Sequence, residues 1–176
     1  VDIGPGLFTG MRVGIASAQA IAQVIDVSII PVTSLDILAA AVQTTNEVIA
    51  SVVDARRGEV YWSLYRMSDG KLKQVGKPQI GSPEMCAVDV LDRGQSTLLV
   101  GTGALKHETE FRERLNPVLP ALEFADDKYS MPLASSLVEI AHERALRGEW
   151  VLVDEVVPMY LRAPDAEINW ATRSAQ

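Results

Sequence analysis

The chain has 176 residues, of which 48% are hydrophobic and 22% charged, with a formal net charge of −7 and one cysteine. This composition is ordinary for a globular protein, and the length suits one domain or one and a half small ones. An acidic chain repels nucleic acid at long range, so contact with RNA would need a partner. No apolar run reaches the roughly 18 residues that span a bilayer. We therefore expect no membrane contact, and because Cys86 cannot form an internal disulfide, we expect a cytoplasmic protein.

A glycine-rich stretch, GPGLFTGMRVG, occupies residues 4 to 14. A dinucleotide fingerprint would need a third glycine where Thr9 stands, and a Walker loop would need Lys-Ser/Thr in place of Met11-Arg12. Anion binding by the N-terminus of the following helix stays open beside a purely structural turn. The candidate anion contacts are Gly4, Gly6, Thr9 and Gly10.

Residues 11 to 25, MRVGIASAQAIAQVI, have small and apolar residues at helical spacing. One stripe contains Gly14, Ala18, Ile21 and Ile25. Small side chains let a second helix approach closely, so both a buried core helix and a helix that docks against another subunit fit this pattern. In the docking interpretation, Met11 and Arg12 lie at the edge of the contact.

Strands and helices alternate along the rest of the chain, which indicates the α/β class. Apolar and alternating runs predict strands at residues 48–54, 59–66 and 97–100, and a last strand or extended edge at 154–162. Helical patterns predict helices at residues 34–45, 104–115 and 133–147. The helix at 34–45 is alanine-rich and capped by Thr33 or Ser34, and we expect it to join the docking surface.

The hairpin between the first two strands carries the dense charges of DARRGEVY, residues 54 to 61. These charges either face water or form a contact for a partner or ligand. The residues concerned are Asp54, Arg56, Arg57 and Glu59. His107 and His142 are far apart on expected helix surfaces, and Cys86 has no neighbouring histidine, so we expect no metal site and no catalytic residue.

A glycine loop that opens a helix normally follows a strand, and Val1–Ile3 is too short to be all of that strand. We therefore expect that upstream residues of the fold are absent from this chain.

Four stretches occur in the order GPGLFTGMRVG, PVTSLDILA, VVDARRGEVYWSLY and VVPMYLR. Together they closely resemble the TsaB family, also called YeaZ, over residues 1 to 165. The resemblance implies a two-lobed α/β fold of the actin/Hsp70 (ribonuclease H-like) type, here without the first strands of the N-terminal lobe. The expected organisation is residues 1–50 as the remainder of that lobe with the docking helices, 51–165 as the C-terminal lobe, and 166–176 as a polar tail.

The resemblance also implies a non-catalytic subunit that binds TsaD, which forms N6-threonylcarbamoyladenosine at position 37 of tRNA. ATP and the metal are then expected on the TsaD partner, with no cofactor on this subunit, tRNA contact only through the complex, and a homodimer when the subunit is alone. The alternative is an enzyme of the actin-like and sugar-kinase superfold that binds or hydrolyses ATP. One departure concerns Leu7, which stands where the family has serine and cannot cap the loop with a hydroxyl.

Overall fold

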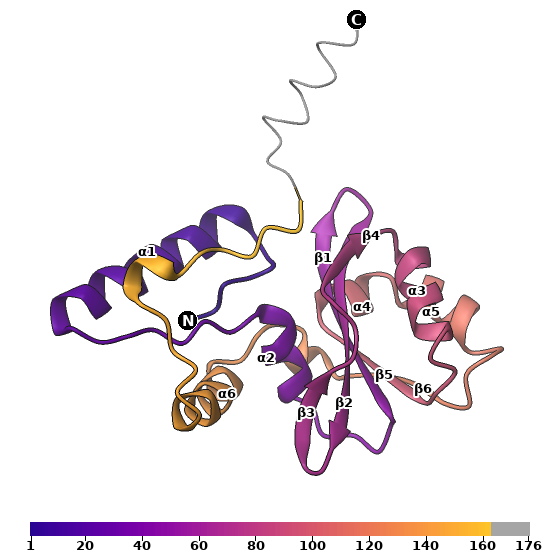
Figure 1. The fold of residues 1–176 in the computed structure, drawn as a ribbon. Helices are drawn as coiled ribbons and strands as arrows, with labels where there is room; N and C mark the ends of the chain where they lie inside the picture. Colours follow the sequence, from indigo (N-terminus) through magenta and orange to yellow (C-terminus); the bar gives the residue numbers. More distant parts are fainter. Residues whose placement is uncertain (163–176) are drawn as a thin grey trace, which may run out of the picture.

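The computed structural model describes residues 1–162 as two parts joined side by side, with α1 on one side of the molecule and a twisted sheet on the other (Figure 1). The helices are α1 (Phe8–Ile25), α2 (Ser34–Ala40), α3 (Pro83–Leu91), α4 (Thr102–Lys106), α5 (Glu108–Leu115) and α6 (Ala134–Leu146). The strands are β1 (Val48–Arg56), β2 (Glu59–Ser68), β3 (Lys71–Gln74), β4 (Gln79–Gly81), β5 (Thr97–Val100) and β6 (Leu122–Phe124). Short 3-10 turns lie at Asp127–Tyr129 (η1) and Val153–Glu155 (η2).

The strands form one mixed sheet in the order β3-β2-β1-β5-β6, with β4 also paired to β2. β1 is antiparallel to β2 and parallel to β5, and β6 continues the parallel side. β1, β2 and β5 confirm the three strands that apolar runs and alternation predicted.

Alternation along β1 divides the interior into two layers. Val48, Ala50 and Val52 face the side that is covered by α3, α4 and α5, where Trp62 and Phe111 are buried. Ile49 faces the other side, beneath α2. In residues 48–52 of β1, a side chain that points away from one helical layer therefore meets another, which explains the run of buried residues at the start of this strand.

α2 begins as predicted, because the Thr33 hydroxyl accepts a hydrogen bond of 3.0 Å from the Asp36 backbone N–H. It ends at Ala40, well before the predicted residue 45. Its prediction as a second docking helix is wrong, because Leu35 and Leu38 are fully buried against the sheet. The alanines serve close packing inside the protein.

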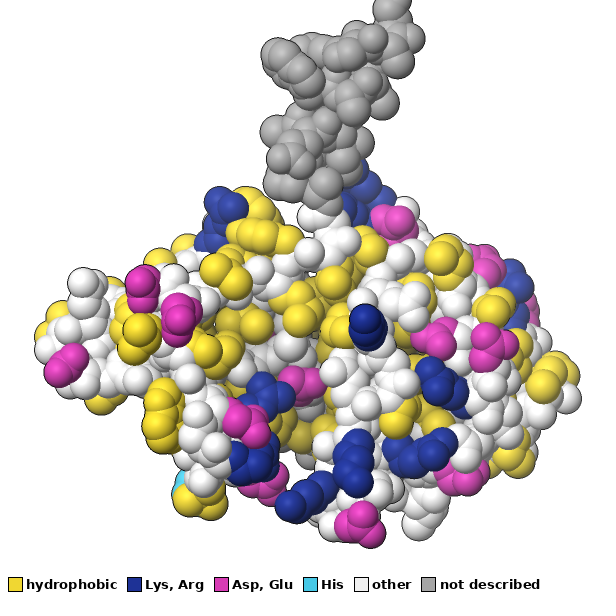
Figure 2. Space-filling model, viewed as in Figure 1, with side chains coloured by type: hydrophobic (Ala, Val, Ile, Leu, Met, Phe, Trp, Pro, Cys, Tyr) yellow, Lys and Arg dark blue, Asp and Glu magenta, His cyan; other side chains and the backbone are white. Residues whose placement is uncertain are grey.

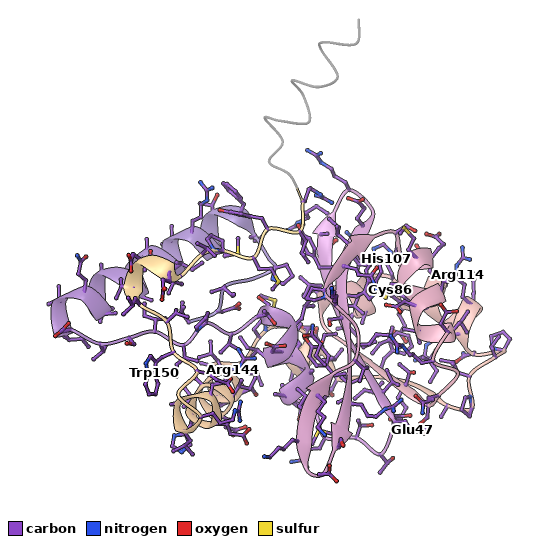
Figure 3. The ribbon with its side chains drawn as sticks, viewed as in Figure 1. Glu47, Cys86, His107, Arg114, Arg144 and Trp150 are labelled. Atoms are coloured by element: carbon purple, nitrogen blue, oxygen red, sulfur yellow. The ribbon has the colours of Figure 1, made fainter. Side chains whose placement is uncertain are left out.

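The predicted helix at 104–115 is interrupted at His107, which leaves the helical conformation and separates α4 from α5. The break turns the imidazole inward, so that only 10% of the side chain is exposed. The prediction of His107 as a solvated surface residue is therefore wrong. His107 and Cys86 are labelled in Figure 3.

Residues 151–162, which we call the C-terminal strap, cross from α1 toward the β1–β2 hairpin (Figure 1). Of the two alternatives predicted for 154–162, a last strand or an extended edge, the strand is wrong, because the strap contains η2 and no strand. Only Val151 forms a β-bridge, with Ile29. Pro158 has no N–H to donate, so a continuous ladder across it is disfavoured.

The predicted boundaries at residues 50 and 165 stay predictions, and the predicted tail at 166–176 lies outside the described residues. α6 packs against α2, where the Arg144 guanidinium donates to Asp36 and to the Pro31 carbonyl at 2.8 and 2.7 Å. Gly148 has the positive φ of 73° expected just after a helix C-terminus. In the described part of the chain, no helix combines the length and apolar character that crossing a membrane requires.

Candidate functional site

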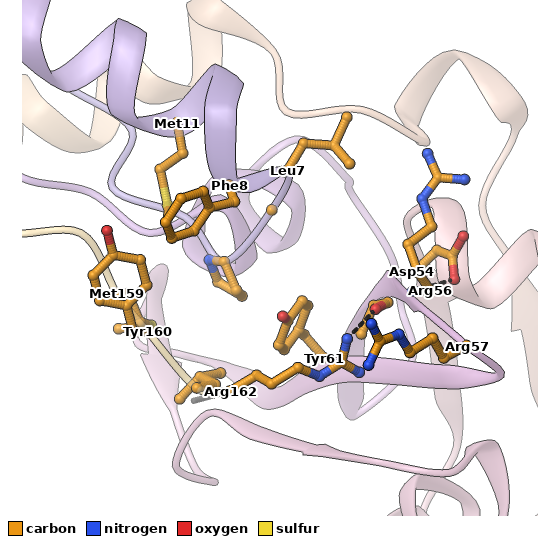
Figure 4. Close-up of a pocket in the computed structure, with 14 residues that line it drawn as sticks. Leu7, Phe8, Met11, Asp54, Arg56, Arg57, Tyr61, Met159, Tyr160 and Arg162 are labelled. Carbon is orange, nitrogen blue, oxygen red and sulfur yellow. Dashed lines mark hydrogen bonds between the residues drawn. The ribbon is translucent and has the colours of Figure 1, made fainter. Parts of the chain in front are cut away.

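An open cleft of about 590 Å³ lies between the loop before α1, the β1–β2 hairpin and the end of the strap (Figure 4). A second hollow of about 460 Å³ continues from it toward Thr102 and Met131. The two share the residues that we use to define the cleft: Pro5, Gly6, Leu7, Met11, Asp54 and Arg56. Hydrophobic side chains gather on the surface between α1 and the sheet in Figure 2.

Hydrogen bonds to Asp2 shape the loop that forms one wall of the cleft. The Asp2 carboxylate accepts hydrogen bonds from the Gly4 N–H at 2.8 Å and from the Ser34 hydroxyl at 2.8 and 2.9 Å. Gly4 has a φ of 93°, a backbone conformation that favours glycine, and its carbonyl accepts from the Ser34 N–H. The loop is thus fixed to the start of α2 before it turns into α1.

α1 begins after Leu7, which provides no side-chain cap. This agrees with the expectation that a leucine side chain cannot cap the helix as a serine hydroxyl could. Of the candidate anion contacts, Gly6 and Gly10 line the hollows, whereas Gly4 is buried behind the loop and Thr9 does not line them. Anion binding by this loop stays a prediction.

The opposite wall is the tip of the hairpin, where Arg56 and Arg57 adopt positive φ angles of 63° and 54°. Asp54 accepts from the Lys106 ammonium at 3.0 Å with both oxygens, and from the Arg56 N–H at 3.0 Å. Partial burial by itself would raise the pKa of the Asp54 carboxyl, but these hydrogen bonds and the charges of Lys106 and Arg56 lower it overall. Asp54 is therefore an ionised, internally paired carboxylate.

The strap forms the third wall and was missed as part of the site by sequence reasoning. Arg162 donates to the Ala55 carbonyl at 2.9 Å and also pairs with Glu59. Tyr160 accepts from Arg12 Nε at 2.6 Å. The signal in the sequence is the stretch VVPMYLR, which contains both Tyr160 and Arg162.

The structure therefore brings the glycine loop and the charged hairpin to one cleft, although some fifty residues separate them in the sequence. Arginine side chains at its rim lie beside apolar and aromatic residues, which suits a ligand with an anionic group and an apolar body. Its carboxylates, Asp2 and Asp54, already accept hydrogen bonds from the protein. Within residues 1–162, no three His, Cys, Asp or Glu side chains converge as a metal site would require.

The predicted docking stripe is split between two faces of α1. Gly14, Ile21 and Ile25 are exposed, the last two by 62% and 60%. Ala18 is half-buried and Met11 packs into the cluster beneath the helix, so both are less accessible to a partner than predicted. The sequence prediction also missed Val13 and Val24, whose side chains are 62% and 85% exposed.

Arg12 lies on neither of these faces. Its guanidinium stacks over the Phe8 ring, with 3.9 Å from its central carbon to the ring centroid, and reaches the Tyr160 ring at 5.5 Å. A role of Arg12 at a docking edge stays a prediction.

Comparison with known proteins places this geometry in a family. The family model described as "TsaD: tRNA N6-adenosine threonylcarbamoyltransferase" matches residues 1–170. The Bacillus subtilis (strain 168) protein named "tRNA threonylcarbamoyladenosine biosynthesis protein TsaB" is 31% identical over 169 residues, which are 95% of this chain and 70% of that protein. The chain belongs to the TsaB family.

Other TsaB relatives agree with this assignment. The Escherichia coli K12 protein with the same name is 28% identical over 162 residues, covering 90% of this chain and 68% of that protein. The solved structure titled "YeaZ from Pseudomonas aeruginosa" superposes with a TM-score of 0.73 at 30% identity, over 91% of this chain and 72% of that one. These matches confirm the predicted family resemblance and the predicted actin-like α/β fold.

Proposed function

We propose that this TsaB-family chain is a non-catalytic subunit that binds a TsaD-family protein and supports the formation of N6-threonylcarbamoyladenosine at position 37 of tRNA. The names of its relatives support the process. The subunit role rests on the surface of α1.

The observation that carries the proposal is an apolar, nearly uncharged face on α1. Its larger members are Val13, Ile21, Val24 and Ile25, with exposed fractions from 60% to 85%. Between them lie the small exposed residues Gly10, Gly14, Ser17 and Ala20. An exposed helix of a monomer normally carries charged side chains, but Arg12 is the only charged residue within α1.

This face is well suited to another helix. The eight residues recur at helical spacing and share one side of α1, whereas Ile15 and Ala22 are buried on the opposite side. Glycine, serine and alanine leave shallow grooves between the valine and isoleucine ridges, so a second helix can approach closely. Contiguous exposed apolar surface of this kind marks protein–protein contacts. The same face is the one expected to pair two copies when TsaD is absent.

The charge of the chain supports the proposal that the partner, and not this subunit, contacts tRNA. A net charge of −7 disfavours direct binding to the phosphate backbone, so we expect tRNA contact through the partner. ATP and the metal are likewise expected on the TsaD-family protein.

The proposal is tested by measuring the mass of the complex with the TsaD-family protein of the same organism by size-exclusion chromatography with light scattering. Ile21→Glu and Val24→Glu place charges at the centre of the face and should abolish the complex. Both side chains are already exposed, so the fold should persist. The matched control is Val118→Glu, which changes another exposed valine (65%) away from α1 and should leave the complex intact.

A complex that survives both α1 substitutions would reject the assigned face. Formation of threonylcarbamoyladenosine by this chain without TsaD would reject the non-catalytic role. If the chain alone is a dimer, Val24→Glu should make it monomeric, because the same face is used.

A further inference from the structure

We infer that the C-terminal strap, residues 151–162, fixes the direction of α1 relative to the sheet, and that Tyr160 and Arg162 are positioning residues for the docking face. The expected effect on partner binding rests on the proposed function. The effect of the strap on the direction of α1 does not depend on it. Its starting point is that α1 does not share a core with the sheet.

The two large clusters of buried residues are built on the sheet and include no residue of α1. α1 instead contributes Ile15, Ala22 and Met11 to a third cluster. The strap supplies Val151, Val153 and Val156 to that cluster, and the remaining members are Val1, Ile3 and Ile29. The strap therefore provides three of the six residues on which α1 rests, and Val1, Ile3 and Ile29 provide the other three.

Polar contacts fix the strap along the length of α1. In the middle of the helix, the Gln19 side-chain amide donates to the carbonyls of Val153 and Val156, at 2.8 and 3.2 Å. Near the start of the helix, Tyr160 accepts the hydrogen bond from Arg12, and its ring lies 5.7 Å from the Phe8 ring, centroid to centroid. The contacts of Arg12 and Gln19 lie more than one helix turn apart, so together they fix the direction of α1. A single contact could not do this.

The other end of the strap is attached to the sheet. Arg162 donates to the Ala55 carbonyl and pairs with Glu59, so one guanidinium holds both strands of the β1–β2 hairpin. Just before Tyr160, the Met159 N–H donates to the Ile3 carbonyl at 2.8 Å. Residues 159 to 162 thus join the N-terminal segment, α1 and the sheet within one short stretch (Figure 4).

The affinity for the partner depends on the fraction of molecules in which α1 has the orientation that the partner binds. If α1 is held in one direction, every molecule presents the docking face in the geometry that the partner accepts. If the anchors are removed and about one molecule in ten has that geometry, the apparent affinity falls about tenfold. The anchoring side chains need not touch the partner to have this effect.

The test measures the distance between α1 and the sheet directly. Spin labels are attached at Gln23→Cys, on α1 but outside the docking face, and at Lys71→Cys on the edge strand β3, both exposed positions. Native Cys86 is fully buried and takes no label in the folded protein. Distance distributions from pulsed electron–electron resonance are then compared between the parent protein and Tyr160→Phe/Arg162→Gln. Arg112→Gln, which removes a surface ion pair on α5, is the matched control.

We expect a broader or shifted distribution in the double variant and an unchanged one in the control. With unlabelled proteins, the affinity for the TsaD-family protein should fall about tenfold in the double variant alone. An unchanged distribution would overturn the role of the strap. A changed distribution with unchanged affinity would overturn the role of Tyr160 and Arg162 in docking. Failure of the parent protein to bind TsaD would reject the proposed function, while the distance measurement still decides the structural inference.

Discussion

Arg12 Nε donates a hydrogen bond of 2.6 Å to the hydroxyl of Tyr160, although 148 positions separate the two residues in the sequence. The guanidinium also stacks on Phe8. The side chain that we expected at the edge of a docking face thus contacts the protein's own strap. This hydrogen bond connects GPGLFTGMRVG with VVPMYLR. These are the first and the last of the four stretches that resemble the TsaB family.

The two faces of α1 should respond differently to the same truncation. Ile15→Ala should lower the free energy of unfolding by about 2–4 kcal/mol, because Ile15 is 3% exposed and its removal leaves a cavity. Ile21→Ala should change it by less than about 0.5 kcal/mol, because that side chain is 62% exposed. Urea denaturation of both variants provides the measurement. Equal losses would mean that the assigned inner and outer faces are wrong.

Gly101 should tolerate no side chain. Its φ is 110°, and a Cβ there would collide with the carbonyl oxygen of Val52. Gly101→Ala should therefore cost more than about 3 kcal/mol, beyond the backbone strain of about 1–2 kcal/mol alone. Gly58→Ala is the control, because Gly58 also has a positive φ of 76° but open space around its Cα. If thermal denaturation shows the same loss of stability for both variants, the close approach of the Val52 carbonyl to Gly101 is wrong.

The Asp54–Lys106 pair should contribute to stability in a pH-dependent way. The pKa of Asp54 is lower in the folded protein than its ordinary 3.8, since the hydrogen bonds and charges around it outweigh its burial. Its contribution is therefore present above pH 3.8 and is lost as the pH falls through the lowered folded pKa. Asp54→Asn should weaken the dependence of unfolding free energy on pH below about 5.

Lys106→Met is the companion variant, because it removes the main hydrogen-bond donor and leaves the carboxylate. It should weaken the same pH dependence. If neither variant differs from the parent protein in this range, the pair does not lower the Asp54 pKa as described.

Cys86 should be inert in the folded protein. Burial raises the pKa of the Cys86 thiol well above its ordinary value, with the nearby charge of Asp89 acting in the same direction. Reaction with a thiol-specific chromogenic reagent should therefore occur only after unfolding, at a rate that rises with denaturant. Met85→Ser gives a control for local access, because it changes the exposed neighbour without uncovering the sulfur. Rapid reaction of the native protein would contradict this packing.

Several elements could be predicted because their signals are local. The alternation in EVYWSLYR identifies β2, since successive strand side chains point to opposite faces. Thr33 and Gly148 mark a helix start and a helix end through hydrogen bonding and backbone conformation within a few residues. The glycine loop and the charged hairpin could also be recognised in the sequence as stretches of unusual composition. That they lie at one cleft could not be predicted from it.

The misassigned elements depended on distant contacts. Helical spacing in α1 located a stripe but not which side of it faced solvent, because the burial of Ile15 depends on Val156 from the far end of the chain. α2 has the same small residues as α1, yet it lies on the sheet. His107 looked solvated among charged neighbours, and only the break between α4 and α5 turns it inward.

The sequence by itself determined the α/β class, the central strands and the family, because periodicity, caps and ordered motifs are properties of neighbouring residues. Only the tertiary structure decided which face of α1 is free, that the glycine loop and the charged hairpin share a cleft, and that the strap joins α1 to the sheet. These features depend on side chains such as Arg12 and Tyr160, which are brought together only when the whole chain packs.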